Sequence, residues 1–321
     1  MIETNQGKQI IALSGGVGGA KLVLGLSKVL PAHSLLVITN TGDDFDHFGL
    51  RICPDTDTVL YTLSGLSDPV KGWGRVDETW TFMQAVQDLG GQSWFNLGDG
   101  DLALHVLRTE RLNRGISLTE VTAELATAMG IDVPIVPMSD QSVGTVVDTP
   151  EGQLAFQHYF VRDRCVPQVT GFEFSGIDSA TPNPVLLEAL DNDPGAIVIA
   201  PSNPFVSVDP ILELPGLRAR LKTSDAPIVA VSPIVGGQAI KGPAAKMMGE
   251  LGKDVSALGV ARHYQGLIDG FVIDEQDREL QTEIEDLGMA VTVAPTIMHD
   301  LATRVDLAQV TLEFAEQLAA K

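Results

Sequence analysis

Two segments near the start of the chain carry residue types that act on phosphates. The first is a glycine-rich turn after the apolar residues 10–13, and it comprises Gly15, Gly16, Gly18, Gly19 and Lys21. A turn between a strand and a helix presents backbone N–H groups and a positive helix end to an anion. Glycines also remove the Cβ atoms that would keep a phosphate away from the backbone. We therefore predict a phosphate site here; the alternative is a tight connection without a ligand.

The second segment is an acid-rich stretch from residue 40 to residue 57, with the carboxylates Asp43, Asp44, Asp46, Asp55 and Asp57. Such crowding is costly unless solvent, hydrogen bonds or a cation relieve it. Mg²⁺ takes oxygen ligands and accompanies phosphates. We therefore predict a magnesium site, with Asp44, Asp55 and Asp57 as candidate ligands. As an alternative for one of the last two, Asp55 or Asp57 caps the helix that follows.

Three later segments add polar side chains. Residues 97–101 read LGDGD and precede a predicted helix over 102–112. In the alternative without a ligand, Asp101 caps this helix and His105 has a structural role. Arg108 is either exposed or facing a phosphate. Two more segments follow predicted strands at the edge that holds the glycine turn. Amide and hydroxyl groups there can contact a nucleotide, or simply form turns. The residues concerned are Ser202, Asn203, Pro204, Ser232 and, in a third candidate contact, Lys241 and Gly242.

The composition narrows the class of protein. The chain has 321 residues, 44% of them hydrophobic, and a net charge of -21, which argues against broad nucleic-acid binding. Neither cysteine belongs to a C-x-x-C pair, so no zinc framework is visible. The polar N-terminal segment lacks the apolar core of a signal peptide, and no stretch is apolar enough to span a membrane. We expect a cytoplasmic protein without a nucleic-acid or membrane partner.

The order of the predicted elements favours an α/β fold. Residues 10–39 read strand, glycine turn, helix, strand, and short apolar runs at 196–200, 228–231, 271–273 and 290–293 read as buried parallel strands. We predict a Rossmann-like, doubly wound, mainly parallel sheet in a single α/β domain over residues 1–321. A helical insertion covers about 58–130, where Ser117 and Glu120 form a capping box and the helix ends at Gly130. A β-hairpin joins residues 145–148 to 154–160.

The ordered set of motifs resembles the 2-phospho-L-lactate transferase family of deazaflavin coenzyme biosynthesis. From about residue 11 to residue 295 the chain reads SGGVGGAKL, NTGDD, RICPDTDT, GWG…DETW, LGDGDLALH, PMSD, PSNP and SPIVGG…KG. The resemblance implies an enzyme that joins a guanylyl-activated phospho-acid to the terminal ribityl hydroxyl of the deazariboflavin Fo. It implies release of GMP, a need for Mg²⁺, a homodimer and a place in the biosynthesis of coenzyme factor 420.

The resemblance also implies roles for individual residues. Asp43, Asp44 and Asp57 are the catalytic candidates, and Asp57, Asn96 and Asp99 are the candidates for binding Fo. The glycine turn and Lys21 would lie at the phosphates, while Ser202, Asn203, Pro204, Ser232 and Gly242 would frame the guanine nucleotide. The chain departs from many relatives at two positions, since Asn96 stands where they carry Lys or Arg and Asp46 where they often carry Trp. The donor acid stays open among phospholactate, phosphoenolpyruvate and phosphoglycerate.

Two other functions compete with this one. A non-catalytic, nucleotide-sugar-binding regulator of the same fold would share the glycine turn but would have no need for the acidic segments around Asp57 and Asp99. A sugar-phosphate nucleotidyltransferase would combine a glycine turn with magnesium carboxylates, but would carry its basic residue within the glycine loop, whereas Lys21 follows it.

Overall fold

A seven-stranded parallel sheet forms the central layer of the computed structural model, which describes residues 8–69 and 73–320. Its strand order is β14-β13-β10-β9-β1-β2-β5, and all neighbouring pairs are parallel. The order reverses between β1 and β9, and open α/β sheets bind ligands outside the carboxyl ends of the strands at such a point. The strands are β1 (Ile10–Ser14), β2 (Leu35–Thr39), β5 (Ile135–Pro137), β9 (Ala196–Ile199), β10 (Ile228–Val231), β13 (Gly270–Ile273) and β14 (Ala290–Val293).

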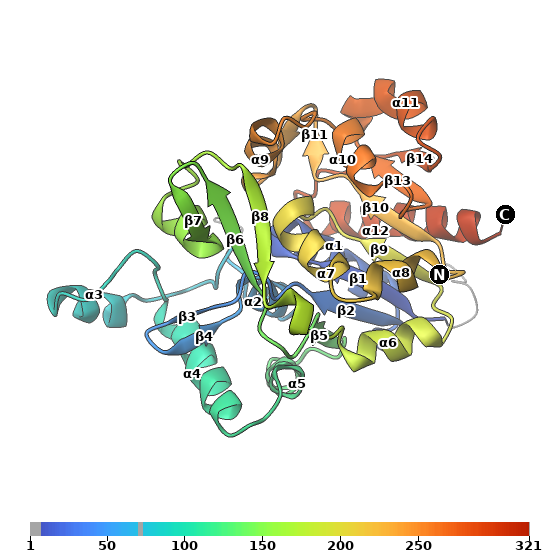
Figure 1. The fold of residues 1–321 in the computed structure, drawn as a ribbon. Coiled ribbons are helices and arrows are strands. Elements are labelled where there is room, and N and C mark those ends of the chain that lie inside the picture. Colours follow the sequence, from blue (N-terminus) through green and yellow to red (C-terminus); the bar gives the residue numbers. More distant parts are fainter. Residues whose placement is uncertain (1–7, 70–72, 321) are drawn as a thin grey trace.

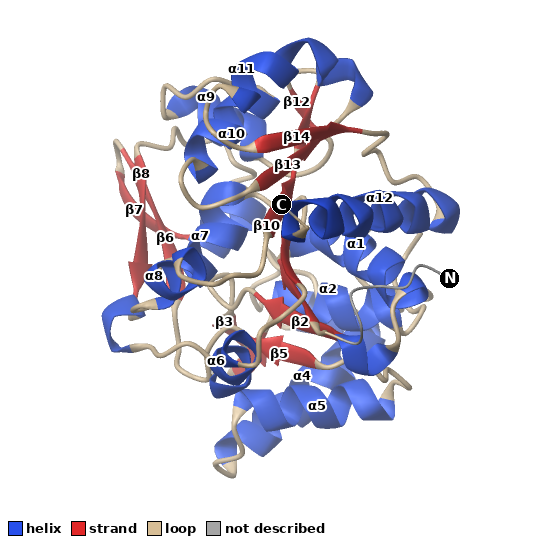
Figure 2. Cartoon of the chain, turned by 90° about the vertical axis from the view of Figure 1, so that its right-hand side faces the viewer, coloured by secondary structure: helices blue, strands red, loops and turns tan. Residues whose placement is uncertain are grey.

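Helices cover both faces of this sheet because its strands are apolar on both sides. In β1, Ile10 and Ala12 pack into one buried core, whereas Ile11 and Leu13 pack into the other. The first core lies under α1 (Gly16–Val29), α2 (Pro54–Leu63) and α12 (Leu301–Ala319), and Figure 2 shows α1 and α12 side by side. The second core lies under α6 (Pro184–Asp191), α7 (Asp209–Leu212), α8 (Leu217–Lys222), α9 (Ala244–Glu250), α10 (Ala257–Tyr264) and α11 (Gln281–Glu285). The predicted doubly wound α/β fold is confirmed.

The segment between β2 and β5 begins with a short antiparallel pair, β3 (Phe45–His47) and β4 (Leu50–Ile52), and continues with helices. These are α2, α3 (Thr81–Asp88), α4 (Asp99–Asn113) and α5 (Leu118–Ala128). The capping box of Ser117 and Glu120 is confirmed at the start of α5. Neither of the two capping alternatives holds. Asp55 and Asp57 lie in the first turn of α2 after Cys53, and α4 begins two residues before Asp101.

A small antiparallel sheet with the order β7-β6-β8 packs beside the central sheet, and Figure 1 shows it in green. β6 (Gly144–Thr149) and β7 (Gly152–Ala155) form the predicted hairpin. The second strand is shorter than predicted, because a π-helical turn (His158–Arg162) follows it and buries Tyr159. The sequence analysis missed the third strand, β8 (Gly171–Ser175). Elsewhere β11 (Ile234–Val235) pairs with β12 (Gln238–Ala239).

The fold also contains 3-10 turns at Ala32–Ser34, Ile177–Ser179 and Glu275–Leu280, and a π turn at Pro204–Val208. In the part of the chain that the structure describes, no helix is both long and apolar enough to cross a membrane.

Candidate functional site

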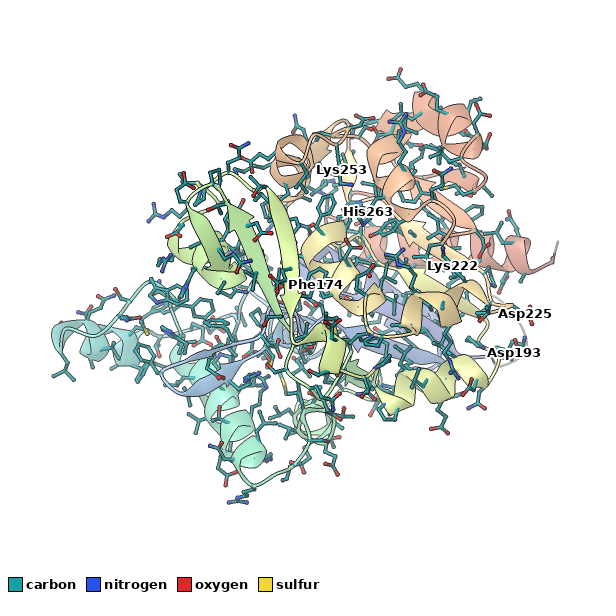
Figure 3. The ribbon with its side chains drawn as sticks, in the orientation of Figure 1. Phe174, Asp193, Lys222, Asp225, Lys253 and His263 are labelled. Carbon is teal, nitrogen blue, oxygen red and sulfur yellow. The ribbon has the colours of Figure 1, made fainter. Side chains whose placement is uncertain are left out.

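The polar segments singled out in the sequence meet at the carboxyl edge of the central sheet. The glycine turn follows β1, the acidic loop follows β2, and Ser202 and Ser232 follow β9 and β10. The small sheet borders the same edge, since Thr145 N donates to Gly42 O over 2.7 Å. Figure 3 labels Phe174 of β8 on this side, and Asp193 and Asp225, which precede β9 and β10, at the opposite edge of the sheet.

The glycine turn is fastened to its neighbours by hydrogen bonds. Gly15 N donates to Ser202 Oγ over 3.1 Å, and the same hydroxyl donates to Gly15 O over 2.6 Å. Gly16, with a φ of 61°, donates its N–H to Asp55 Oδ1 over 2.7 Å. The carboxylate of Asp55 therefore lies at the N-terminus of α1, a position that favours an anion. Ser202 and Asp55 thus fix the entry to α1.

The glycines of this turn have a packing role that the sequence analysis did not anticipate. An ideal Cβ on Gly18 would lie 2.2 Å from Pro201 O, and one on Gly19 would lie 2.5 Å from Ser14 Oγ. At Gly15 the nearest atom would be Ser207 Cβ, at 2.5 Å. These three positions face protein atoms, so glycine is needed there to bring α1 close to the loops after β1 and β9. Phosphate binding at the turn stays a prediction.

Two buried carboxylates lie together beside the turn. Asp55 accepts from Asn40 Nδ2 over 2.9 Å, and its neighbour Asp43 is 7% exposed, with Oδ1 enclosed and lacking a hydrogen-bond partner. Burial raises the pKa of Asp43 well above its usual range, and the charges of Asp55 and Asp44 raise it further. Burial also raises the pKa of Asp55, against the hydrogen bonds from Asn40 and Gly16. A bound cation would offset the repulsion between the Asp43 and Asp55 carboxylates.

Asp44 is enclosed a short way from this pair. Neither of its carboxylate oxygens has a hydrogen-bond partner of good geometry. Burial raises the pKa of Asp44 to about 8, against the opposing effects of the nearby Cys53 thiol and of Arg108. At neutral pH this side chain therefore holds a proton unless a cation approaches it.

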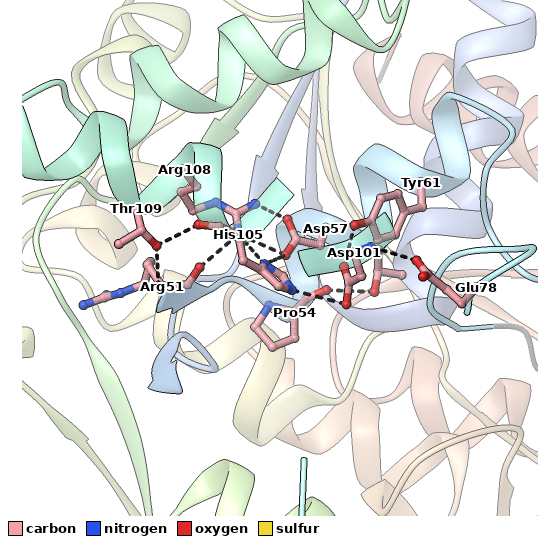
Figure 4. Close-up of polar contacts among 10 residues, drawn as sticks. Arg51, Pro54, Asp57, Tyr61, Glu78, Asp101, His105, Arg108 and Thr109 are labelled. Atoms are coloured by element: carbon pink, nitrogen blue, oxygen red, sulfur yellow. Dashed lines mark hydrogen bonds and ion pairs between the residues drawn. The ribbon is translucent and has the colours of Figure 1, made fainter. Parts of the chain in front are cut away.

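Asp57 belongs to a second, separate group, which Figure 4 shows in close-up. Arg108 of α4 donates from Nη1 to Asp57 Oδ2 over 3.1 Å, and from Nη2 to Asp57 Oδ1. It also donates to His105 Nδ1 over 3.3 Å. Because a guanidinium only donates, Nδ1 accepts and the ring proton is on Nε2, which lies 3.2 Å from Asp101 Oδ2. The chain of contacts runs from Asp57 through Arg108 and His105 to Asp101.

Asp101 is fixed at the far end of this group. Tyr61 Oη donates to Asp101 Oδ1 over 2.5 Å, and the Glu78 carboxylate accepts from the N–H groups of Gly100 and Asp101, each over 2.8 Å. Burial would raise the pKa of Asp101, but the nearby His105 ring and the hydrogen bond from Tyr61 lower it overall. The sequence analysis missed this group. The spacing of Asp101, His105 and Arg108 on one face of α4 was the available signal.

The three carboxylates predicted as metal ligands are divided between these groups. Asp55 lies at the glycine turn, Asp57 lies against Arg108, and Asp44 is enclosed nearby. Among residues 8–69 and 73–320, no three His, Cys, Asp or Glu side chains form a cluster that could hold a metal ion by themselves. A magnesium ion therefore stays a prediction, and it would need ligands from a bound substrate.

Comparison with known proteins identifies the family. The model of the family described as 2-phospho-L-lactate transferase CofD matches residues 10–311. The chain belongs to the CofD family. It is 41% identical over 303 residues to the 2-phospho-L-lactate transferase of Methanosarcina barkeri (strain Fusaro / DSM 804), covering 94% of this chain and 97% of that protein. It is 39% identical over 317 residues to the phosphoenolpyruvate transferase of Kitasatospora aureofaciens, covering 97% and 98%.

A solved structure shares the fold of this CofD-family chain. A member of the UPF0052 family from Bacillus halodurans superposes with a TM-score of 0.64 and covers 95% of this chain and 98% of its own. The two sequences are 17% identical, so this likeness supports the fold alone.

The positions that the CofD resemblance assigned to Fo lie around α3 and α4. The Asp99 carboxylate accepts from Thr81 N over 3.1 Å and from Phe82 N over 3.0 Å, so it caps α3. Asn96 is exposed in the loop before α4, and Asp46 pairs with Arg51 over 2.8 Å. A cluster of aromatic side chains lies next to Asn96: Phe45, His47, Trp94 and Phe95. Gly72 of the GWG motif lies outside the described residues.

The positions assigned to the nucleotide are largely engaged in turns of this CofD-family fold. Asn203 Oδ1 accepts from Phe205 N over 3.0 Å, and Ser232 Oγ donates to Ile234 O over 2.8 Å. Pro204 is buried at the start of its π turn, and Gly242 has a φ of 75°. The Asn203 and Ser232 side chains thus stabilise their own turns, and nucleotide binding at these positions stays a prediction.

Proposed function

We propose that the protein transfers a phospho-acid from a guanylyl-activated donor to the terminal ribityl hydroxyl of the deazariboflavin Fo and releases GMP, as a step in coenzyme factor 420 biosynthesis. The observation that carries this proposal is the likeness to transferases of the CofD family over 94–97% of the chain. The buried carboxylates beside a helix N-terminus at the sheet's switch point support it, because such sites handle phosphates. Relatives that act on phospholactate and on phosphoenolpyruvate match about equally well, so both acids are candidate donors.

The reaction balances as a displacement at phosphorus. The ribityl oxygen forms a bond to the phosphorus of the phospho-acid, and the bond from that phosphorus to the bridging oxygen breaks. The bridging oxygen leaves with GMP, and the hydroxyl proton passes to a carboxylate or to water. As in other phosphoryl transfers, in-line positioning and charge stabilisation provide most of the catalysis.

The carboxylates at the turn fit a magnesium ion. Asp43 Oδ1 is enclosed without a partner, and Asp55 lies beside it with a raised pKa. Mg²⁺ is usually held by one or two carboxylates and completed by substrate phosphate oxygens. We assign Asp43 and Asp55 as its protein ligands and leave Asp57 out, since Arg108 binds both of its oxygens. When bound, the ion would neutralise charge on the phosphates.

In this arrangement the chain's own residues do three things. Asn40 and the Gly16 N–H hold the Asp55 carboxylate in place from two sides. Ser202 fixes the glycine turn to the loop after β9. The ion pair between Asp57 and Arg108 holds α4 against α2, and thereby holds the loop that carries Asn96 beside the acidic segment.

The test is whether GMP forms only when Fo is present. Protein incubated with Mg²⁺, Fo and guanylyl-phospholactate or guanylyl-phosphoenolpyruvate should release GMP in proportion to the Fo consumed. Binding of a UDP-sugar, with no GMP released from either donor, would overturn the proposal in favour of the nucleotide-sugar-binding regulator.

A further inference from the structure

Three basic side chains gather near the glycine turn in a chain whose net charge is -21. Lys21 lies on α1, Arg304 in the first turns of α12, and Lys241 in the loop after β12. The two helices touch closely, because an ideal Cβ on Gly25 of α1 would lie 2.1 Å from Arg304 O. Figure 2 shows the two helices running side by side. The three cations therefore come from distant parts of the sequence to one place.

The positive charge of Arg304 is offset in part by Asp300, which does not form an ion pair with it. Lys21 Nζ donates to a backbone oxygen, Met298 O, over 3.1 Å. Arg304 Nε is enclosed and has no hydrogen-bond partner. Within the described ranges neither side chain forms an ion pair, although the protein has twice as many acidic as basic residues. Two neighbouring cations without ion-pair partners are electrostatically unfavourable in the protein alone, and a bound anion would offset that cost.

The ionisation behaviour of these groups agrees with this geometry. Burial lowers the pKa of Lys21, and the nearby charges of Arg304 and Lys241 lower it further. Burial also lowers the pKa of Arg304, against the effect of Asp300.

The cations and the carboxylates reach the region of the glycine turn from different elements. Asp43 and Asp55 approach from the β2 side, together with Asn40. Lys21 follows Gly18 by three residues and shares its face of α1, and Gly18 faces Pro201 in the loop after β9. Met298, which binds Lys21, lies in the loop between β14 and α12. A substrate that crosses the turn would meet acidic groups at one end and basic groups at the other.

We propose that Lys21 and Arg304 form an anion subsite for the phosphate of the guanylyl leaving group. This inference rests on the proposed function, in which the bridging oxygen departs with GMP. That phosphate changes from a singly charged ester-anhydride to a nearly doubly charged monoester as the bond breaks. Cations placed around it favour the departing form over the bound donor, which lowers the barrier to transfer.

The test uses GMP and guanosine as two probes that differ only in the phosphate. Titration calorimetry would compare the wild-type chain with Arg304→Met and Lys21→Met. We expect GMP to bind at least about tenfold more weakly to each variant, as for the loss of one charge-assisted hydrogen bond, with guanosine binding unchanged. The melting temperature should not fall, because each substitution relieves repulsion between cations. Lys28→Met is the matched control: it removes an exposed lysine from the last turn of α1 and should change neither affinity.

Each outcome has a definite meaning. Unchanged GMP affinity in Arg304→Met and Lys21→Met would overturn the subsite while leaving the transferase proposal intact. Loss of guanosine binding together with a lower melting temperature would show a structural role instead. Weaker GMP binding in both variants of a protein that fails to transfer to Fo would support the subsite and overturn the proposed function.

Discussion

The guanidinium of Arg108 donates to both carboxylate oxygens of Asp57, with the Arg108 side chain fully buried and that of Asp57 6% exposed. The two residues lie 51 positions apart, on α4 and α2. The pair therefore joins the RICPDTDT motif to the helix that begins in the LGDGDLALH motif. The acidic start of α2 is thereby held against the face of α4 that also carries His105 and Asp101.

Asp57→Asn should lower the free energy of unfolding by about 3–5 kcal/mol, because it leaves the Arg108 charge buried without its partner. The measurement is urea denaturation of the variant and the wild type. Asp46→Asn is the control, since its exposed pair with Arg51 should contribute about 1 kcal/mol or less. Equal, small losses in the two variants would contradict this role for Asp57. The resemblance assigns Asp57 a catalytic and Fo-binding role, and the ion pair with Arg108 adds a structural one.

Asp44→Asn should stabilise the protein increasingly as the pH rises. The folded pKa of Asp44 is about 8, above its ordinary value of 3.8, so the unfolded chain loses this proton first and the folded state loses stability between about pH 4 and pH 8. The Asp44→Asn variant has no carboxyl group at this position, so it does not lose this stability as the pH rises. Melting curves in the presence of EDTA should show no gain at pH 4 and a gain that grows toward pH 8. A gain independent of pH would show that Asp44 does not titrate in this way.

In the presence of guanylyl-phospholactate and without Fo, Mg²⁺ should raise the melting temperature of the wild type by a few degrees at concentrations well above its dissociation constant. Asp55→Asn should lose most of this shift, while its amide oxygen still accepts the Gly16 N–H. Asp46→Asn, which removes an exposed carboxylate from the same region, should keep the shift. Scanning fluorimetry with and without Mg²⁺ provides the comparison. A full shift in Asp55→Asn would exclude Asp55 as a ligand.

Gly18→Ala should destabilise the protein by about 1–3 kcal/mol, as expected for overpacking, because the new Cβ would lie 2.2 Å from the backbone oxygen of Pro201. Gly249→Ala is a matched control in α9, where the nearest atom to the new Cβ is a Val255 methyl group at 3.6 Å. That change should be neutral or stabilise by up to about 1 kcal/mol. Chemical denaturation of both variants tests the packing role, which fails if Gly18→Ala is as stable as Gly249→Ala.

The local patterns of the sequence were sufficient for the parallel sheet, because a buried strand such as β10 (Ile228–Val231) is a short apolar run between turn residues. The capping box of Ser117 and Glu120 is also local, and it was confirmed. The ion pair between Asp57 and Arg108 was not predictable, since spacing on α4 identifies a face but not the partner across from it. The same limit applies to Asp99. Its carboxylate caps α3, which is distant in the sequence, although Asp99 itself lies in α4. The π turn after β7 was missed because its buried Tyr159 fits a strand pattern equally well.

The central claim is transfer of a phospho-acid to Fo, and mass spectrometry of the reaction products tests it most directly. The protein would be incubated with Fo, Mg²⁺ and an equimolar mixture of guanylyl-phospholactate, guanylyl-phosphoenolpyruvate and guanylyl-phosphoglycerate. Our account predicts a phosphodiester adduct of Fo with phospholactate or phosphoenolpyruvate and an equal amount of GMP. Unmodified Fo, recovered from protein shown to be folded, would contradict it.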